Sequence, residues 1–203
     1  MLNLPRLASP RAVVVLAILA LALATVRPNP ERYGDRLQVA LPLLALGCSA
    51  VTGGAGEFAL RYAGMFLTVH GLKGGLGQTA INERPNGGYR GMPSAHTSTA
   101  VLGASALVHD CLRGSPLAQG AVLVAAGFTG ASRIGAGAHD IWQVLIGALI
   151  GWAWDRALRR PSRARDTVRS ALVAIWRTAA RTCANALSRA ARGYSAFLRR
   201  IRN

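Results

Sequence analysis

The chain has 203 residues, of which 51% are hydrophobic and only 6% aromatic, and its formal net charge is +16. The apolar residues are clustered into long runs and the mean hydropathy is +0.28, a pattern that argues against one or two water-soluble domains. Alanine, leucine and glycine are abundant, and small residues allow transmembrane helices to pack closely. The composition therefore predicts a single multi-helix membrane domain.

Six apolar runs approach the length of about 20 residues that a membrane-spanning helix needs. They lie at residues 10–27, 37–54, 57–75, 94–109, 116–132 and 139–157. The sequence thus predicts an all-α, integral membrane six-helix bundle within residues 1–160. The first run also fits a cleaved signal peptide, with Ala22-Leu23-Ala24 as a cleavage motif. We favour its retention as a helix, because the number of crossings is then even.

Residues 161–203 form a strongly basic tail. Thirteen arginines and two aspartates lie between residues 155 and 203, and Pro161 and Ser162 separate the tail from the last apolar run. Apolar residues recur at helical spacing from 172 to 201, which predicts an amphipathic helix held on the cytoplasmic membrane surface by anionic lipids. A partner-binding helix is the alternative. We expect no nucleic-acid partner, because anionic lipid explains the charge with fewer assumptions.

Arginine placement also predicts the orientation in the membrane. Arg6 and Arg11 precede the first run, Arg113 follows the fourth, and the tail is basic. The positive-inside rule then places both termini in the cytoplasm, and we expect the membrane to be a bacterial inner membrane. The loops at 28–36, 76–93 and 132–139 would face the extracytoplasmic side, although charges of both signs around the first loop weaken the bias.

Three polar islands interrupt the apolar runs and carry the candidate chemistry. They are Asn82–Glu83–Arg84–Pro85, Pro93–Ser94–Ala95–His96, and Ser132–Arg133 followed by His139. Two predicted crossings separate the third island from the other two. All three islands are therefore expected on the same membrane face, where they can form one site.

These side chains suit a phosphate ester. Arg84 and Arg133 offer planar, permanently charged groups that match phosphate oxygens. Ser94 offers a hydroxyl, and a helix that begins near it directs backbone N–H groups at an anion. His96 and His139 can divide the attack on phosphorus and the protonation of the leaving group between them. The islands therefore predict an anion pocket with a nucleophile and a proton donor.

In order and spacing, the islands resemble the three signature motifs of the type-2 phosphatidic acid phosphatases, a superfamily that includes the vanadium haloperoxidases. The resemblance covers residues 73–147 and extends through the six-helix layout to about residue 157. It implies that His139 attacks phosphorus to form a phosphohistidine, and that His96 protonates the leaving oxygen and later activates water. The implied phosphate ligands are Arg84, Arg133, Ser94 and the Ala95 amide. The resemblance implies no divalent metal and no cofactor.

Two departures from the family pattern affect phosphate binding. The lysine expected seven residues before Arg84 is replaced by Gly77, and Lys73, one helical turn earlier, is the nearest substitute. Ala95 stands where glycine is commoner, but alanine keeps the backbone amide that the role requires.

A third departure affects the nucleophile. The family usually has an aspartate four residues after the attacking histidine, and here that position is Gln143. On a helix, Gln143 would share a face with His139 and could accept a hydrogen bond from the imidazole, as an amide does in some cysteine proteases. It would supply no negative charge. Asp140 is the alternative partner if the helix starts later.

The substrate class follows from the expected location. A site at the membrane interface selects a head group whose chain stays in the bilayer, so we predict a lipid phosphate. Phosphatidate, phosphatidylglycerophosphate, lipid A phosphates and polyprenyl diphosphates all remain eligible. A non-catalytic lipid-phosphate binder and a lipid phosphotransferase are the alternative functions.

The three cysteines carry no recognisable chemistry. Cys48, Cys111 and Cys183 are widely separated and show no spacing suited to a zinc site. We interpret them as small apolar fillers or bystanders.

Overall fold

The computed structural model describes residues 9–26, 28–157 and 159, together with separate positions between 166 and 188. The chain divides into two units, Met1–Arg159 and Arg160–Asn203. The described positions of the second unit are helical. Most of the predicted amphipathic tail helix, and Cys183 within it, lie outside the described residues.

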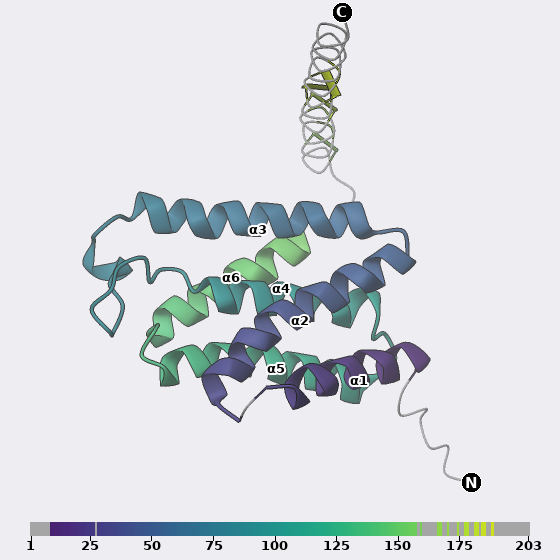
Figure 1. The fold of residues 1–203 in the computed structure, drawn as a ribbon, viewed down its shortest axis with the longest axis horizontal. Coiled ribbons are helices and arrows are strands. Elements are labelled where there is room, and N and C mark those ends of the chain that lie inside the picture. The colour runs from purple at the N-terminus through teal and green to yellow at the C-terminus, as the bar shows by residue number, and fades with distance from the viewer. Residues whose placement is uncertain are drawn as a thin grey trace, which may run out of the picture. The chain divides into compact units, whose positions relative to one another are not determined.

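Six α-helices lie among the described residues of the first unit (Figure 1). In chain order they are α1 (Pro10–Ala24), α2 (Pro30–Val51), α3 (Ala55–Gly75), α4 (Ala95–Asp110), α5 (Pro116–Gly135) and α6 (Ile141–Ala157), and a short 3₁₀ helix, η1 (Ala80–Asn82), lies between α3 and α4. No strand occurs among the described residues. The prediction of an all-α architecture with six helices is confirmed for this part of the chain.

Two helices extend further than the apolar runs predicted. α2 begins at Pro30 rather than near residue 37, because the Asn29 side chain accepts a hydrogen bond from the Glu31 N–H (2.8 Å) and proline is well suited to the first helical position. α5 continues to Gly135, so Arg133 lies in its last turn and not in a loop. The charged residues at the start of α2 and at the end of α5 therefore lie on helical backbone, which holds them in place.

The helices differ in how well they suit a bilayer. Of those in the described residues, α5 alone is both long and apolar enough to cross a membrane, while α1 is apolar but has only 15 residues. α2 and α3 have 22 and 21 residues but carry several charges, and α4 and α6 have 16 and 17. The predicted six crossings are therefore not established by helix length and composition.

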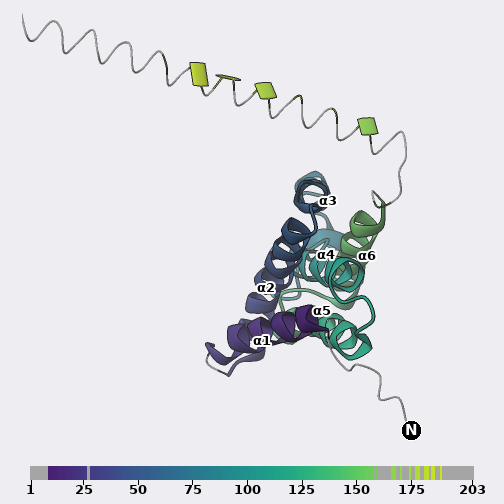
Figure 2. The ribbon, with the colours of Figure 1, turned by 90° about the vertical axis from the view of Figure 1, so that its right-hand side faces the viewer.

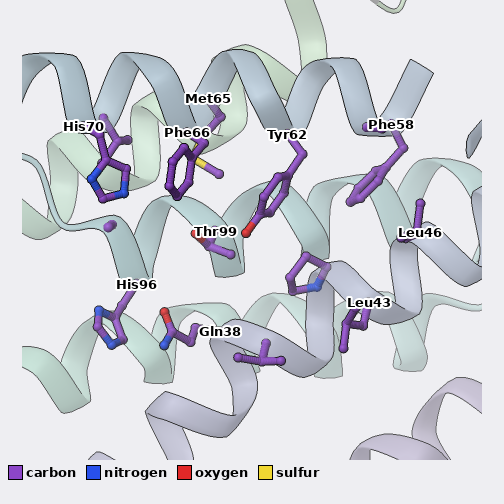
Figure 3. A pocket seen from close by; sticks show the side chains of 15 residues that line it. Gln38, Leu43, Leu46, Phe58, Tyr62, Met65, Phe66, His70, His96 and Thr99 are labelled. Atoms are coloured by element: carbon purple, nitrogen blue, oxygen red, sulfur yellow. The ribbon is translucent and has the colours of Figure 1, made fainter. Parts of the chain in front are cut away.

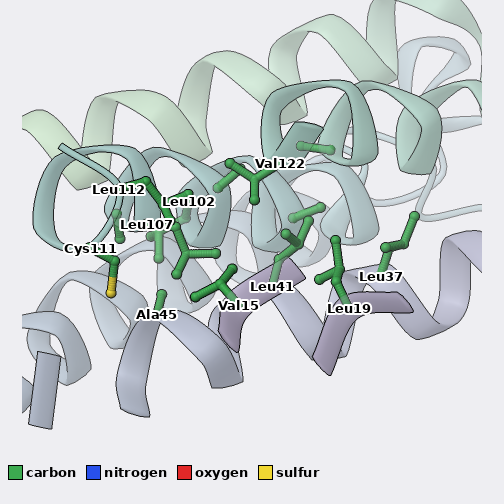
Figure 4. Close-up of a cluster of buried hydrophobic side chains, with 14 of the residues drawn as sticks. Val15, Leu19, Leu37, Leu41, Ala45, Leu102, Leu107, Cys111, Leu112 and Val122 are labelled. Carbon is green, nitrogen blue, oxygen red and sulfur yellow. The ribbon is translucent and has the colours of Figure 1, made fainter. Parts of the chain in front are cut away.

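α4 occupies the centre of the bundle and packs against α2, α3, α5 and α6 (Figures 1 and 2). Leucines, valines and alanines of α1, α2, α4 and α5 form the apolar core between them (Figure 4). The starts of α2, α4 and α6 and the ends of α3 and α5 lie together on the left of Figure 1. All three polar islands lie at or next to these helix ends.

Two glycines let α6 approach α4 unusually closely. A Cβ atom on Gly147 would lie 2.6 Å from the Ser94 carbonyl oxygen, and one on Gly151 would lie 2.2 Å from that of Ser98. The four-residue spacing of Gly147 and Gly151 places both on one helix face, which is the small-residue pattern of close membrane-helix pairs. The Ser94 N–H also donates to the Gln143 carbonyl oxygen (2.9 Å). The second and third islands are therefore joined through α4 and α6.

A cluster of charged side chains closes the opposite end of the bundle. Arg159 binds Asp110 (2.6 Å) and Asp155 (2.8 Å), and Arg61 lies 3.7 Å from Asp110. Ser105 donates a hydrogen bond to Asp155, which is fully buried. The buried charges are paired, so this cluster ties α3, α4 and α6 together.

The interpretation of the cysteines was wrong for two of the three. Cys48 and Cys111 form a disulfide between the end of α2 and the end of α4, with their Cα atoms 6.1 Å apart. Their wide separation in sequence gave no sign of this pairing, because it depends on how the two helices pack.

Candidate active site

A buried asparagine organises the long loop that carries the first island. Asn82 is completely buried, and its Nδ2 donates to the carbonyl oxygens of Lys73 (3.1 Å) and Gly77 (2.7 Å). Its Oδ1 accepts from the Met92 N–H (3.0 Å). Asn82 therefore fastens both ends of the loop to the end of α3, which fixes the loop residues between them.

Two cations of the site meet at one backbone carbonyl. The Lys73 Nζ donates to the Arg90 carbonyl oxygen (2.6 Å), and the Arg84 Nη2 contacts the same oxygen (3.4 Å). The Lys73 side chain reaches this point although the residue is only 7% exposed. The structure thus brings Lys73, the residue predicted to substitute for the missing lysine, to Arg84.

Gln143 joins the expected nucleophile to the first island. Its Nε2 donates to the Glu83 carbonyl oxygen (2.6 Å), and its Oε1 lies 3.0 Å from the His139 Nδ1. A carbonyl oxygen can only accept, so the amide nitrogen must face Glu83 and the amide oxygen must face His139. The proton of neutral His139 therefore sits on Nδ1, and Nε2 keeps the lone pair that attack on phosphorus requires.

The surroundings of Gln143 leave little room for another side chain. A Cβ atom on Gly91 would lie 2.5 Å from the Gln143 Nε2, so any larger residue at that position would displace the Gln143 amide. Asp140 has a different task, since its Oδ1 accepts from the Gln143 backbone N–H (2.8 Å) at the start of α6. Of the two candidate partners for His139, Gln143 is the one placed against the ring.

The pKa of His139 is low. The residue lies in the loop between α5 and α6, outside both helices, and is 3% exposed. Burial, together with the positive charges of Lys73, Arg84 and His96, lowers its pKa to about 4, against an opposing contribution from the Gln143 hydrogen bond. The imidazole is therefore neutral at pH 5–8 and available as a nucleophile.

This pKa should respond to charge in a defined direction. Lys73→Met removes a cation that disfavours the imidazolium, so we expect the pKa of His139 to rise above its wild-type value. Titration of the ring carbon signals of His139 by NMR measures this. Arg113→Gln, at the other end of the bundle, serves as the control and should leave the pKa unchanged. An unchanged pKa in the Lys73→Met variant would mean that Lys73 does not face the ring.

An acidic residue that the sequence did not single out lies between Arg133 and His96. Asp35, on the first turns of α2, lies 2.9 Å from the Arg133 Nη1 and 3.2 Å from the His96 Nε2. Glu31, one turn earlier, lies 3.3 Å from the Arg133 Nη2. Two carboxylates thus occupy donors that a phosphate would use. The spacing of Glu31 and Asp35 could have revealed them only if α2 had been predicted to start at Pro30.

Ser94 and Ala95 form the start of α4. The Ser94 Oγ accepts from the Thr97 hydroxyl (3.0 Å) and backbone N–H (3.5 Å), and the residue is completely buried. Ser94 therefore acts as the helix cap. Ala95 is the first residue of α4, where backbone N–H groups lack helical acceptors and the helix dipole favours an anion.

Two guanidinium nitrogens of the site are buried without an acceptor from the described part of the protein. Within the described residues, the Arg84 Nε and the Arg133 Nε are buried without a hydrogen-bond partner. Buried donors are rarely left unsatisfied, and a phosphate oxygen is a strong acceptor with matching geometry. No group of three or more potential metal-ligating side chains occurs in the described part of the chain. The donor set suits an oxyanion.

The chain is also similar to a known family. A family model described as the PAP2 superfamily matches residues 66–166. The chain belongs to the PAP2 superfamily. No curated protein and no solved structure matches it. PAP2 membership supports a phosphoesterase activity in general, and PAP2 proteins are commonly associated with membranes. The matched range includes the three islands and Gln143 but begins after Asp35.

Proposed function

We propose that the chain is a membrane-embedded, metal-independent phosphatase that hydrolyses a lipid phosphate through a phosphohistidine. The observation that carries this proposal is a cavity that begins at His96 and runs between α2, α3 and α4 (Figure 3). Its volume is about 540 Å³. An elongated apolar cavity beside a phosphate site is what a phosphate with a hydrocarbon chain requires.

The dimensions and lining of this cavity fit an acyl or prenyl chain. His96 and Gln38 lie at one end, and Phe58 and Leu46 lie at the other (Figure 3). From His70 to Phe58, α3 spans about 18 Å at 1.5 Å per residue. A chain in one leaflet covers about half of the bilayer's roughly 30 Å hydrocarbon core. The cavity is long enough for most of such a chain.

The reaction follows from the positions of the side chains. Arg84, Arg133 and the start of α4 would hold the phosphate after its oxygens displace Asp35 from Arg133. The His139 Nε2 then forms a bond to phosphorus while the ester P–O bond breaks, and His96 donates a proton to the departing oxygen. Water, deprotonated by His96, attacks the phosphohistidine and releases inorganic phosphate. His139 is thus freed of the phosphoryl group, and His96 regains the proton that it donated.

Phosphate release from a panel of lipid phosphates tests the proposal directly. Purified protein in neutral detergent should release phosphate in the presence of EDTA, because no step uses a metal. Binding without release would instead indicate the non-catalytic binder. Transfer of the phosphate to an added lipid alcohol would indicate the phosphotransferase. Loss of activity with EDTA would contradict the mechanism.

Blocking the cavity should distinguish lipid from soluble substrates. Thr99→Trp places a large ring in the middle of the cavity. We expect kcat/KM for a long-chain phosphate to fall at least about tenfold, because each excluded methylene forfeits about 0.8 kcal/mol, while hydrolysis of a short soluble ester is unchanged. Val124→Trp, on the exposed face of α5, is the control. Equal loss for both substrates would show that the cavity is not a chain site.

The orientation proposed for the membrane places the catalytic end outside the cytoplasm. Arg11, Arg113, Arg156 and Arg159 lie toward the other end, in agreement with the positive-inside rule. The Cys48–Cys111 disulfide favours the reverse orientation, because it lies at this same end and disulfides persist mainly in oxidising compartments. Reporter fusions after Arg113 and after Gly87 distinguish the two orientations.

A further inference from the structure

In the part of the chain that the structure describes, two arginines on α2 lack acidic partners of the kind that Arg61, Arg133 and Arg159 have. Arg32 and Arg36 are four residues apart and share a helix face, where like charges destabilise a helix. Within the described residues neither forms an ion pair or a side-chain hydrogen bond. Arg133 and Arg159, in contrast, each bind two carboxylates. Two exposed cations without an acidic partner among the described side chains therefore lie side by side at the start of α2.

These arginines border a second cavity, between α1 and α2. Its volume is about 810 Å³, and below the arginines it is lined by apolar residues, among them Ile18 and Ala22 of α1 and Val39 and Leu43 of α2. Three of these are well exposed: Ile18 at 45%, Val39 at 51% and Leu43 at 60%. An apolar groove with two cations at one end has the shape and charge of a lipid site.

Asp35 also lines this cavity but does not cancel its charge. Its carboxylate is bound by the Arg133 Nη1 (2.9 Å) and the His96 Nε2 (3.2 Å). The negative charge of Asp35 is thus already balanced from the catalytic side. The charge of this cavity that has no counter-ion in the described part of the protein is therefore that of Arg32 and Arg36.

We propose that the groove between α1 and α2 binds an anionic phospholipid, with its phosphodiester between Arg32 and Arg36 and an acyl chain against Ile18, Ala22 and Leu43. This site is separate from the substrate cavity, which lies on another side of α2, although Val39 and Leu43 line both. The lipid is a bound component and not a substrate. The proposal therefore holds whether or not the protein hydrolyses a lipid phosphate.

Photocrosslinking tests this site on the full chain. The probe is phosphatidylglycerol with a photoreactive acyl chain, added to the purified protein in neutral detergent, and crosslinked residues are mapped by mass spectrometry. We expect labelling of the facing sides of α1 and α2. Arg32→Gln/Arg36→Gln should weaken it about 30-fold, given about fivefold per basic residue at a membrane surface. Ala22→Trp, which fills the groove but keeps both arginines, should also abolish it.

Matched controls exclude the simpler explanations. Arg113→Gln/Arg156→Gln removes the same charge at the other end of the bundle and should leave the labelling unchanged. Labelling by a photoreactive phosphatidylcholine should be much weaker, and excess inorganic phosphate should not compete. Equal labelling by the neutral lipid, equal loss in the control variant, or full competition by inorganic phosphate would each overturn the proposal. Without anionic lipid, Arg32→Gln/Arg36→Gln should be at least as heat-stable as the wild type, which shows that the variant folds.

Discussion

Replacing His139 with alanine should abolish phosphate release. His139 is the proposed nucleophile, its Nδ1 is held by Gln143, and its Nε2 therefore keeps the lone pair that attack requires. Loss of a nucleophile that works as a unit with its partners removes most of the catalytic effect, so we expect a decrease of at least about 10⁴-fold in kcat. The measurement is phosphate release from one long-chain lipid phosphate, supplied as the only substrate.

A trapped intermediate makes this experiment specific. The wild type, denatured during turnover of a radiolabelled substrate, should carry an acid-labile phosphoryl group on His139, and the alanine variant should carry none. His109→Ala, at the opposite end of α4, is the matched control and should retain both the label and full activity. Substantial phosphate release by the His139→Ala variant would exclude the phosphohistidine route.

The residues of the site could be recognised from the sequence because they are local. Arg84, His96 and His139 each stand in a short polar island between apolar runs, and the even number of helices between the islands is enough to place them at one end of a bundle. The close packing that joins them could not be recognised in the same way. It depends on Gly147 and Gly151 meeting the backbone of α4, which is a property of two helices together.

Asp35 shows why part of the site was missed. It lies far from the islands in the sequence, in a stretch predicted as a loop, and its role depends on α2 starting at Pro30. The capping of that helix by Asn29 is a local signal, but a run of charged residues hides it from any search based on hydropathy. The same stretch supplies Arg32 and Arg36. The start of α2 thus contributes to two sites that apolar periodicity cannot predict.

Gln143→Leu should lower kcat about 100-fold while KM changes little. Leucine has a similar volume but cannot accept the His139 Nδ1–H or donate to the Glu83 carbonyl oxygen. The imidazole then loses its fixed tautomer and orientation, and outer-shell partners of this kind commonly contribute 10–100-fold. A positioning role predicts loss in the chemical step and not in binding. Steady-state kinetics with a lipid phosphate measure both parameters.

A comparison with Gln143→Glu separates positioning from simple packing. Glutamate keeps the length and the acceptor toward His139, but its second oxygen would face the Glu83 carbonyl oxygen, which can only accept. We expect it to recover part of the kcat that leucine loses, and to raise the pKa of His139, because a carboxylate stabilises the imidazolium. The acid side of its kcat/KM profile should therefore move to higher pH than in the wild type. If Gln143→Leu were as active as the wild type, Gln143 would be a packing residue and the orientation of His139 would have another origin.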